Sequence, residues 1–275
     1  MKKISFIIMA LIFISSCSKP EPVNFGLLEN IDGTYYLRGE SKPFSGPVFN
    51  VTGFLSGSSG NISKGKFEGE FKSFFGDGKQ LRSIDTFKNG LRNGKFEYYY
   101  SNGQLSSKGS YVNGNYDGKI EEFTWEGNPL SIHVYENGVP ITATNYTYFD
   151  NGNLSYIENL KDGITSDEGI LDGVVTSYEE DGNLDYIENY KDGYLDGLVE
   201  EYGDNGLISI REYYKEGRLN GQSTMFYEDG SETISTQGIY ENGKRVGIWK
   251  NFDSNGNLKE EVTYENGKKI STKEY

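Results

Sequence analysis

Residues 94–118, GKFEYYYSNGQLSSKGSYVNGNYDG, decide the fold. Asn102-Gly103 lies between two short runs, the first of them rich in aromatic residues. Asn-Gly in this setting is the strongest local signal for a β-hairpin, because both central turn residues need a positive φ. Asn113-Gly114 then turns the chain back toward Gly118. The stretch therefore predicts a β-hairpin followed by a return turn.

The pattern of this stretch recurs along the chain, mostly at steps of 24 to 26 residues. Each regular unit has an opening glycine, a hairpin glycine nine residues later and a closing glycine. The hairpin and closing series share one long step of 30 residues, so a single insertion around Thr165-Ser166-Asp167-Glu168 explains both. Glycines that fix this frame include Gly78, Gly90, Gly94, Gly103, Gly114, Gly118, Gly193, Gly197, Gly206, Gly217 and Gly221.

Two large residues recur in register with the glycines. One, such as Tyr99, lies four residues before the hairpin glycine, and the other, such as Tyr111, lies three before the closing glycine. Aromatic residues at one register stack across neighbouring strands, and each pair contributes roughly 0.2–1 kcal/mol. A single hairpin is unstable alone, so several must stack. We expect an all-β fold, an elongated antiparallel meander of about nine hairpin repeats of ~24 residues.

The N-terminus is typical of an export signal. Residues 1–3 are basic, and residues 4–14 form an apolar run too short to span a bilayer but suited to a secretory signal. The run ends in Ile14-Ser15-Ser16-Cys17, which resembles the lipobox of bacterial lipoproteins. We expect residues 1–17 to be a lipoprotein signal peptide, with Cys17 as the lipid anchor. The alternative is an ordinary cleaved signal peptide with an incidental cysteine.

The rest of the chain divides into a tether and a repeat domain. Residues 18–30 predict a short extended tether, and residues 31–275 the repeats. Within the domain, residues 31–64 predict a degenerate capping unit and residues 65–270 the regular units, because terminal repeats are usually atypical. Two places break the pattern, Gly138-Val139-Pro140 and the insertion near Asp167. Both are candidate binding loops, although neutral drift in surface loops explains them as well.

Composition and charge exclude some classes of function. The chain has 41 acidic and 27 basic residues among 275, which gives a formal net charge of -14. Nucleic-acid binding needs a basic surface that displaces counterions from phosphates, so we expect no nucleic-acid partner. Cys17 is the only cysteine, which excludes a disulfide within the chain. The acidic surface indicates a well-solvated protein.

A search for catalytic and metal-binding groups finds little. His133 is the single histidine, and it cannot form a Cys/His dyad or a multi-histidine metal site. Carboxylates recur at repeat positions, whereas a catalytic pair should be singular. Calcium is a weaker alternative, with oxygen donors at Asp181, Asn183 and Asp185, or at Asp167 and Glu168, but the EF-hand spacing is absent. We therefore expect no enzyme activity, no cofactor and no metal site.

The segment from Tyr111 to Gly118 resembles the MORN repeat, an aromatic residue followed by glycines three and seven residues later. The same motif begins at Tyr190, Tyr214 and Tyr240. The 24-residue step, the turns and the leader are similar to a bacterial MORN variant found in many secreted lipoproteins. Some members of that group are labelled antitoxins of toxin–antitoxin systems. The resemblance covers roughly residues 31–270 and implies an architecture, not a function.

The tyrosines have two interpretations. They pack a thin sheet that has little core, or they form an exposed face that stacks on sugars or on a partner. Alternation along the strand places Tyr99 on the face opposite Tyr98 and Tyr100, so one face can stay exposed. The candidate binding residues are Tyr98, Tyr99, Tyr111, Tyr190, Tyr214 and Tyr240.

These observations predict a non-enzymatic repeat protein that serves as a scaffold or protein-binding surface. The expected location is the bacterial cell envelope, at the outer membrane or cell surface, with only the lipid on Cys17 in the membrane. The alternative is a carbohydrate- or cell-wall-binding module that uses an exposed tyrosine face. The expected partner is accordingly an unidentified protein or a cell-wall glycan.

Overall fold

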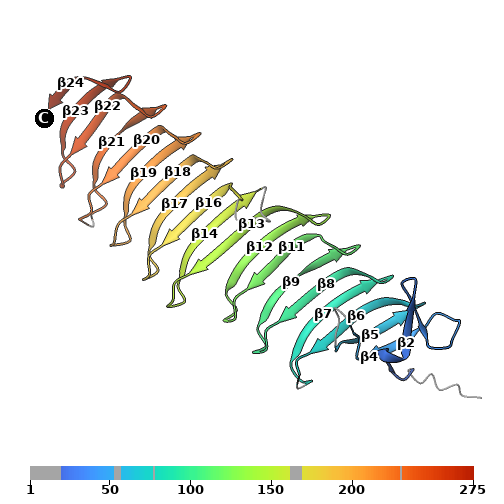
Figure 1. Cartoon of the computed structure of the whole chain (residues 1–275). Coiled ribbons are helices and arrows are strands. Elements are labelled where there is room, and N and C mark those ends of the chain that lie inside the picture. The colour runs from blue at the N-terminus through green and yellow to red at the C-terminus, as the bar shows by residue number, and fades with distance from the viewer. Residues whose placement is uncertain (1–19, 53–56, 77, 162–168, 230) are drawn as a thin grey trace, which may run out of the picture.

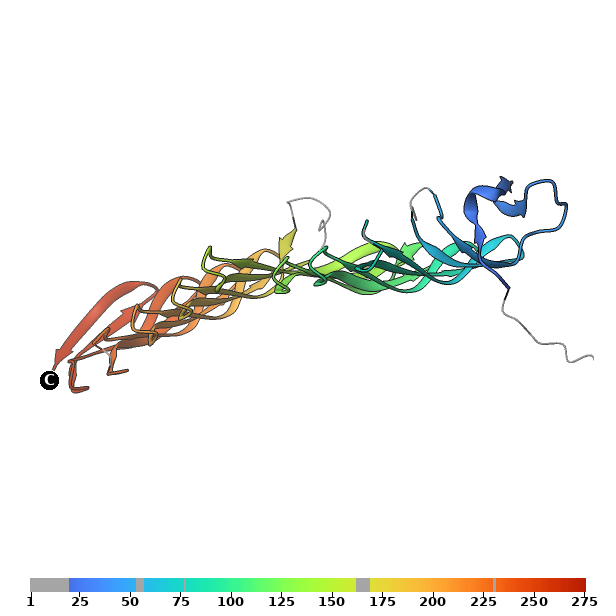
Figure 2. The same cartoon turned by 90° about the horizontal axis from the view of Figure 1, so that it is seen from below.

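The computed structural model describes residues 20–52, 57–76, 78–161, 169–229 and 231–275. These residues form a long ribbon in which short strands lie across the long axis and follow one another from the N-terminal to the C-terminal end (Figure 1). In the perpendicular view the repeats are one sheet thick (Figure 2). The expected signal peptide, its Cys17 and the insertion at residues 165–168 lie outside the described residues.

The repeats consist of strands that leave the closing turns and strands that return to them. The leaving strands are β6 (Lys66–Phe74), β8 (Leu91–Tyr99), β10 (Asn115–Tyr116) with β11 (Gly118–Phe123), β13 (Val139–Tyr148), β15 (Ile170–Leu171) with β16 (Gly173–Tyr178), β18 (Tyr194–Tyr202), β20 (Arg218–Phe226), β22 (Lys244–Phe252) and β24 (Lys268–Glu274). The returning strands are β7 (Leu81–Lys88), β9 (Leu105–Val112), β12 (Pro129–Glu136), β14 (Leu154–Lys161), β17 (Leu184–Lys191), β19 (Ile208–Lys215), β21 (Ile234–Glu241) and β23 (Leu258–Glu265).

The N-terminal end carries shorter elements. They are β1 (Val23–Asn24), the 3-10 helix η1 (Phe25–Leu27), β2 (Leu28–Ile31), β3 (Thr34–Leu37), β4 (Gly46–Phe49) and β5 (Ser59–Ser63). One sheet of 22 strands contains all of the strands except β2 and β3, which pair with each other. Its strands pair antiparallel in a hairpin meander, apart from the parallel pair β1 and β4. The predicted all-β hairpin array is confirmed, and the described residues contain no α-helix.

Tight two-residue turns form the closing edge of the ribbon. In the turn of Asn113 and Gly114 both residues have a positive φ, 50° and 88°, as a type I′ turn requires. The Gly114 amide donates to the carbonyl of Arg92, 2.8 Å away, and Arg92 lies just beyond the previous closing turn. The same bond joins Gly90 to Phe67, Gly138 to Tyr116, Gly193 to Leu171, Gly217 to Leu195, Gly243 to Leu219 and Gly267 to Arg245. Each closing turn within the described residues is therefore fastened to the unit before it.

In four units an acidic residue before the opening glycine strengthens this connection. The carboxylate of Asp117, next to Gly118, accepts a hydrogen bond from the amide of Asn137 in the following closing turn, at 3.3 Å. Corresponding bonds run from Asn89 to Glu68, from Asp192 to Asp172 and from Glu216 to Asp196. The acidic residue of the repeat thus caps the next turn. Every glycine of the predicted frame has a positive φ.

The hairpin loops differ from the expectation for Asn102-Gly103. Gly103 has a φ of 90°, but Asn102 is not among the described residues with positive φ. The loop consists of the three residues between Tyr100 and Gln104. The Tyr100 amide donates to the carbonyl of Gln104, and the Gly103 amide donates to the carbonyl of Tyr100. This is a type I turn followed by a glycine that makes a bulge. The Asn102 side chain is used instead as an acceptor for the Gln104 amide, at 2.9 Å.

The unit that begins at Gly138-Val139-Pro140 has a different β-bulge from the regular units. In a regular unit the pairing passes from Tyr190 opposite Leu195 to Glu188 opposite Val199, which leaves two extra residues on β18. Here it passes from Tyr135 opposite Pro140 to Val134 opposite Thr142, with a single extra residue on β13. Neither Thr142 nor Ala143 has a positive φ, so this bulge has no need of the opening glycine.

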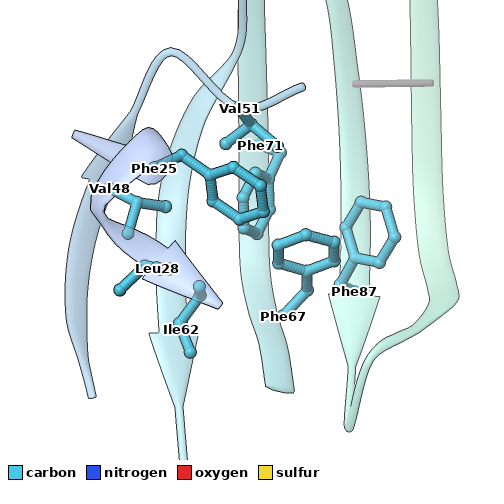
Figure 3. Packing of buried hydrophobic residues seen from close by; sticks show 8 residues of the cluster. All are labelled: Phe25, Leu28, Val48, Val51, Ile62, Phe67, Phe71 and Phe87. Atoms are coloured by element: carbon cyan, nitrogen blue, oxygen red, sulfur yellow. The ribbon is translucent and has the colours of Figure 1, made fainter. Parts of the chain in front are cut away.

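The cap begins earlier than residue 31. Phe25 and Leu28, placed by the sequence in the tether of residues 18–30, are 8% and 6% exposed and belong to the N-terminal core. Figure 3 shows these two side chains with those of Val48, Val51, Ile62, Phe67, Phe71 and Phe87. The ordered fold starts with β1 at Val23, because η1 and β2 cover the apolar side chains of the first regular strands.

Large side chains on the sheet lie over small ones on adjacent strands. Trp249 is 1% exposed, and a Cβ added to Gly238 on β21 would lie 2.1 Å from its ring. Gly60 lies against Phe71 in the same way, and Gly109 lies against Ile120. These three glycines lie within strands and not in turns. They provide space for the few fully buried residues of a sheet that has no second layer.

We predict that Gly238→Ala destabilises the C-terminal units. The new methyl group overlaps the Trp249 ring, and overpacking of this kind costs about 1–3 kcal/mol. Urea unfolding followed by tryptophan fluorescence, in a Trp125→Phe background that leaves Trp249 as the remaining tryptophan, should show a lower midpoint. Gly76→Ala is the matched control, because nothing lies within 4 Å of its Cβ position. Equal midpoints for the two variants would contradict this packing.

Candidate functional site

One face of the ribbon carries a continuous row of large side chains along the closing edge, here called the spine. Its members precede the closing glycines by three residues and are Phe87, Tyr111, Tyr135, Leu160, Tyr190, Tyr214, Tyr240 and Tyr264. Each pairs across the strand with a residue that follows the closing turn, as Tyr111 does with Tyr116 and Tyr190 with Leu195. Directly paired residues share a face, so the row defines a spine face and an opposite face.

Most candidate tyrosines lie on the spine face and are engaged there. Tyr111 is buried, and its ring stacks on Tyr116 at 4.7 Å. The other candidates are partly buried. Their hydroxyls take part in hydrogen bonds: Tyr98 with Asp85, Tyr99 with Glu97, Tyr190 with Glu188, Tyr214 with Glu212, Tyr111 with Arg92 and Tyr240 with Arg245. These tyrosines therefore form a packed network and not an open platform.

The network changes the acidity of the phenols. Burial, followed by the charge of Glu212, raises the pKa of Tyr214 to about 12. The hydrogen bond to Glu97 is the main cause that raises the pKa of Tyr99 to about 12. Burial also raises the pKa of Glu201, with the charges of Glu212 and Glu188 as further causes. The middle of the spine face is thus both acidic and partly shielded from water.

An ion pair lies beside the spine where the cap ends. Arg92 Nε is 3.0 Å from Asp85 Oδ1, and the Tyr98 hydroxyl donates to the same oxygen at 2.9 Å. Asp85 is only 3% exposed, and the Arg92 guanidinium lies 5.1 Å from the centre of the Tyr111 ring. Burial, followed by the Asp85 charge, raises the pKa of Tyr98 well above its ordinary value. Asp85 is therefore in contact with a half-buried guanidinium and with a phenol that favours its protonated form.

A hollow of about 700 Å³ opens above this ion pair. Tyr100 and Trp125, from two neighbouring hairpin loops, form one wall, and their ring centres are 5.2 Å apart. Asp85, Arg92 and the rings of Tyr98, Tyr111 and Tyr116 also line the hollow. The hollow joins polar groups and aromatic rings from several strands, and it is the candidate small-molecule site of the described residues.

Sequence reasoning selected Tyr98 and Tyr111 but missed Asp85, Arg92 and Trp125. The missed signal is a departure from the repeat. Position 85 corresponds to Gly109 and Gly238 in other units, and position 92 corresponds to Tyr116, Leu195 and Arg245. Where Arg245 recurs without the aspartate, its guanidinium lies 4.2 Å from the centre of the Trp249 ring instead. Glu158, Glu188 and Glu212 also occupy the first position, so the available clue was the combination of a carboxylate there with an arginine at the second position, which occurs in this unit alone.

The calcium alternative receives no support from its ligands. Asp181 accepts hydrogen bonds from the backbone amide and the side chain of Asn183, both at 2.9 Å, and therefore caps its own turn. Asp185 accepts from Ser177 at 3.0 Å. No group of acidic, histidine or cysteine side chains suited to a metal ion occurs in the described part of the chain. Asp167 and Glu168 lie outside it.

The opposite face carries an exposed apolar strip over β16 to β22. Its members are the exposed Val174, Tyr213, Ile239 and Ile248, together with the partly buried Leu198. They follow one row of the sheet, since Leu198 pairs with Tyr213 and Gln222 with Ile239. Ile239 and Ile248 are 51% and 54% exposed and line a shallow hollow of about 320 Å³. Exposed apolar side chains gathered in one patch make this strip a candidate for contact with another macromolecule.

Comparison with known proteins agrees with the architecture. The family model described as MORN repeat variant matches residues 92–113, 171–192 and 245–275, so this repeat is detected at three places. No curated protein matches the chain. Among solved structures, a porin-like protein from Bacteroides uniformis is 10% identical, with 86% of this chain and 91% of that chain covered. Its TM-score of 0.16 is too low for any inference.

No helix of the described residues has the length and apolar character needed to cross a membrane.

We predict that Glu97→Gln lowers the pKa of Tyr99 from about 12 toward its ordinary value of 10. A raised phenol pKa means that folding favours the protonated form, so the stabilisation is complete below about pH 10 and is lost as the pH rises through about 12. NMR titration of tyrosines labelled with carbon-13 at Cζ measures the shift. Glu126→Gln, in a hairpin loop, is the control. An unchanged Tyr99 titration in Glu97→Gln would refute the assignment.

Proposed function

We propose that this chain is a non-enzymatic repeat protein of the bacterial envelope whose ribbon binds a protein partner. The observation that carries the proposal is the apolar strip on the opposite face. Its exposed residues follow one row across several repeat units, and an ordinary solvated sheet face would be polar there. Repeat ribbons of this kind offer extended surfaces to partners.

The strip supports a protein in preference to a sugar polymer. Ile239 and Ile248 are aliphatic, and aliphatic side chains bury well against protein but provide no ring for a sugar. The tyrosine row of the spine face, the expected platform for a glycan, is already occupied by packing and hydrogen bonds. The carbohydrate alternative keeps support at one place, the hollow beside Tyr100 and Trp125.

The non-enzymatic part of the proposal rests on how the carboxylates are distributed. Glu188 and Glu212 occupy the same position in successive units, and each accepts from the tyrosine two residues later. Repetition of this kind serves the architecture, whereas a catalytic pair depends on one special environment. The MORN repeat variant, detected at three places, is compatible with a binding role.

We predict that Ile239→Lys together with Ile248→Lys abolishes partner binding. Two charges on the strip require desolvation in any apolar interface, and a loss of about tenfold or more in affinity follows. A photo-crosslinking amino acid at Gln222, inside the strip, should capture the partner in native envelopes. The adduct should disappear in the double variant.

The matched control is Val112→Lys together with Leu130→Lys, two exposed apolar residues outside the strip. This control should leave the adduct intact. The proposal fails if the adduct persists in the strip variant or if both variants lose it equally.

Envelope anchoring is a separate part of the proposal and rests on the lipobox residues Ile14 to Cys17. We predict that the protein partitions into detergent and carries fatty acyl groups on Cys17. Cys17→Ser should remove the acyl mass and leave an unprocessed precursor. Unchanged lipid content and processing in Cys17→Ser would contradict anchoring while leaving partner binding untouched.

A further inference from the structure

The hollow on the spine face has the composition of a small-molecule site. Its volume of about 700 Å³ falls within the range of roughly 300–1,000 Å³ usual for ligand pockets. Aromatic rings and hydrogen-bonding groups both line it. Strands β6 to β10 and three hairpin loops all contribute, so the hollow depends on several units at once.

The aromatic wall is fixed in place before any ligand arrives. The Tyr100 hydroxyl donates to the carbonyl of Phe123 at 2.8 Å, which ties its ring to the neighbouring loop. The side-chain amide of Asn102 donates to the carbonyl of Trp125, also at 2.8 Å. Trp125 nevertheless remains 48% exposed, whereas Trp249, the other tryptophan of the chain, is 1% exposed. Trp125 thus presents an indole to solvent on a rigid support.

The polar side is equally well ordered. Asp85 lies at the base, where Arg92 and Tyr98 hold one of its oxygens. Ser73 and Ser83 also line the hollow, and their hydroxyl oxygens are 2.7 Å apart. Serine hydroxyls both donate and accept, a guanidinium donates, and a carboxylate accepts. Together these groups match the hydroxyls of a sugar, which also donate and accept.

The balance of charge distinguishes the hollow from the rest of the surface. The chain as a whole carries a net charge of -14. The hollow contains Arg82 and Arg92 against Asp85, so its lining is slightly positive. A saccharide that carries a carboxylate therefore meets no net repulsion here, although it would meet repulsion over the acidic middle of the spine face, and a neutral saccharide is repelled by neither surface.

We propose that this hollow binds a saccharide, with one sugar ring against Trp125 and Tyr100 and its hydroxyls directed to Asp85, Arg92 and the serines. The apolar face of a pyranose is satisfied by the indole, and its rim is satisfied by the polar groups opposite. The proposal depends on the proposed function only in treating the chain as a binding protein. The saccharide site and the apolar strip lie on opposite faces and in different units.

The experiment uses the folded, soluble mature chain with three probes, cellobiose, N,N′-diacetylchitobiose and a glucuronate-containing chondroitin disaccharide. Ligand-observed saturation-transfer NMR should show binding of at least one probe. Trp125→Ala should weaken that binding by roughly tenfold or more, since ring stacking accounts for much of the affinity. Because Trp125 is exposed, its removal should leave the fold intact, which circular dichroism checks.

Tyr194→Ala is the matched control, an aromatic residue that is 63% exposed and outside the hollow. It should bind as the parent chain does. Iodide quenching of the parent chain provides a second readout, because a bound sugar should protect the exposed Trp125. The proposal is overturned if no probe binds, or if Trp125→Ala and Tyr194→Ala bind equally well. The strip variant Ile239→Lys with Ile248→Lys should still bind the saccharide. The saccharide test and the protein-partner test therefore fail independently of each other.

Discussion

The structure depends on the hydrogen bond from each closing glycine to the unit before it. In the turn at Gly138 the amide reaches the carbonyl of Tyr116, and Asp117 caps the preceding residue of the same turn. A sheet one layer thick has no core that could enforce its register. The register is instead set at the described closing turns, where a positive φ and an amide act together, joined at four of them by an acidic side chain. Stability therefore comes from contacts between neighbouring units, as in other linear repeat proteins.

This constraint explains why the two faces of the sheet carry different side chains. The spine face carries the aromatic row, because rings in register shield one another and the closing edge from water. The opposite face does not carry this aromatic packing, and its exposed apolar residues between Val174 and Ile248 are available to a partner. The cap covers only the first strands of the spine face, as the core around Phe67 and Phe87 shows (Figure 3). The hollow beside Arg92 lies next to this covered region.

Much of the fold could be predicted from the sequence because its determinants are local. Turn chemistry at Asn113-Gly114 and the period of the glycines define a hairpin meander without any knowledge of distant contacts. The exact turn at Asn102-Gly103 could not be predicted, because Asn-Gly suits both a type I′ turn and a type I turn with a bulge. The predicted start of the cap, at residue 31, lies too far along the chain. Phe25 and Leu28 belong to the core only through contacts with later strands, which the local sequence does not indicate.

The candidate site was less accessible to sequence reasoning for a related reason. Asp85 and Arg92 lie on adjacent strands, and a bulge between Asp85 and Phe87 shifts the pairing that brings them together. A bulge of one residue or two cannot be read from spacing alone, as the unit at Pro140 demonstrates. Tyr190 and Tyr214 recur at a fixed repeat position, but their engagement with Glu188 and Glu212 depends on side-chain geometry.

Small-angle X-ray scattering of the mature chain tests the open ribbon most directly. A sheet of 22 strands spaced roughly 4.8 Å apart is about 100 Å long, and a thin rod of that length has a radius of gyration of about 30 Å. A compact globule of 275 residues would give about 19 Å. A value near 30 Å with the cross-section of a single sheet is the expected result. A value near 19 Å would show that the ribbon folds back on itself, and the two open faces would then not exist.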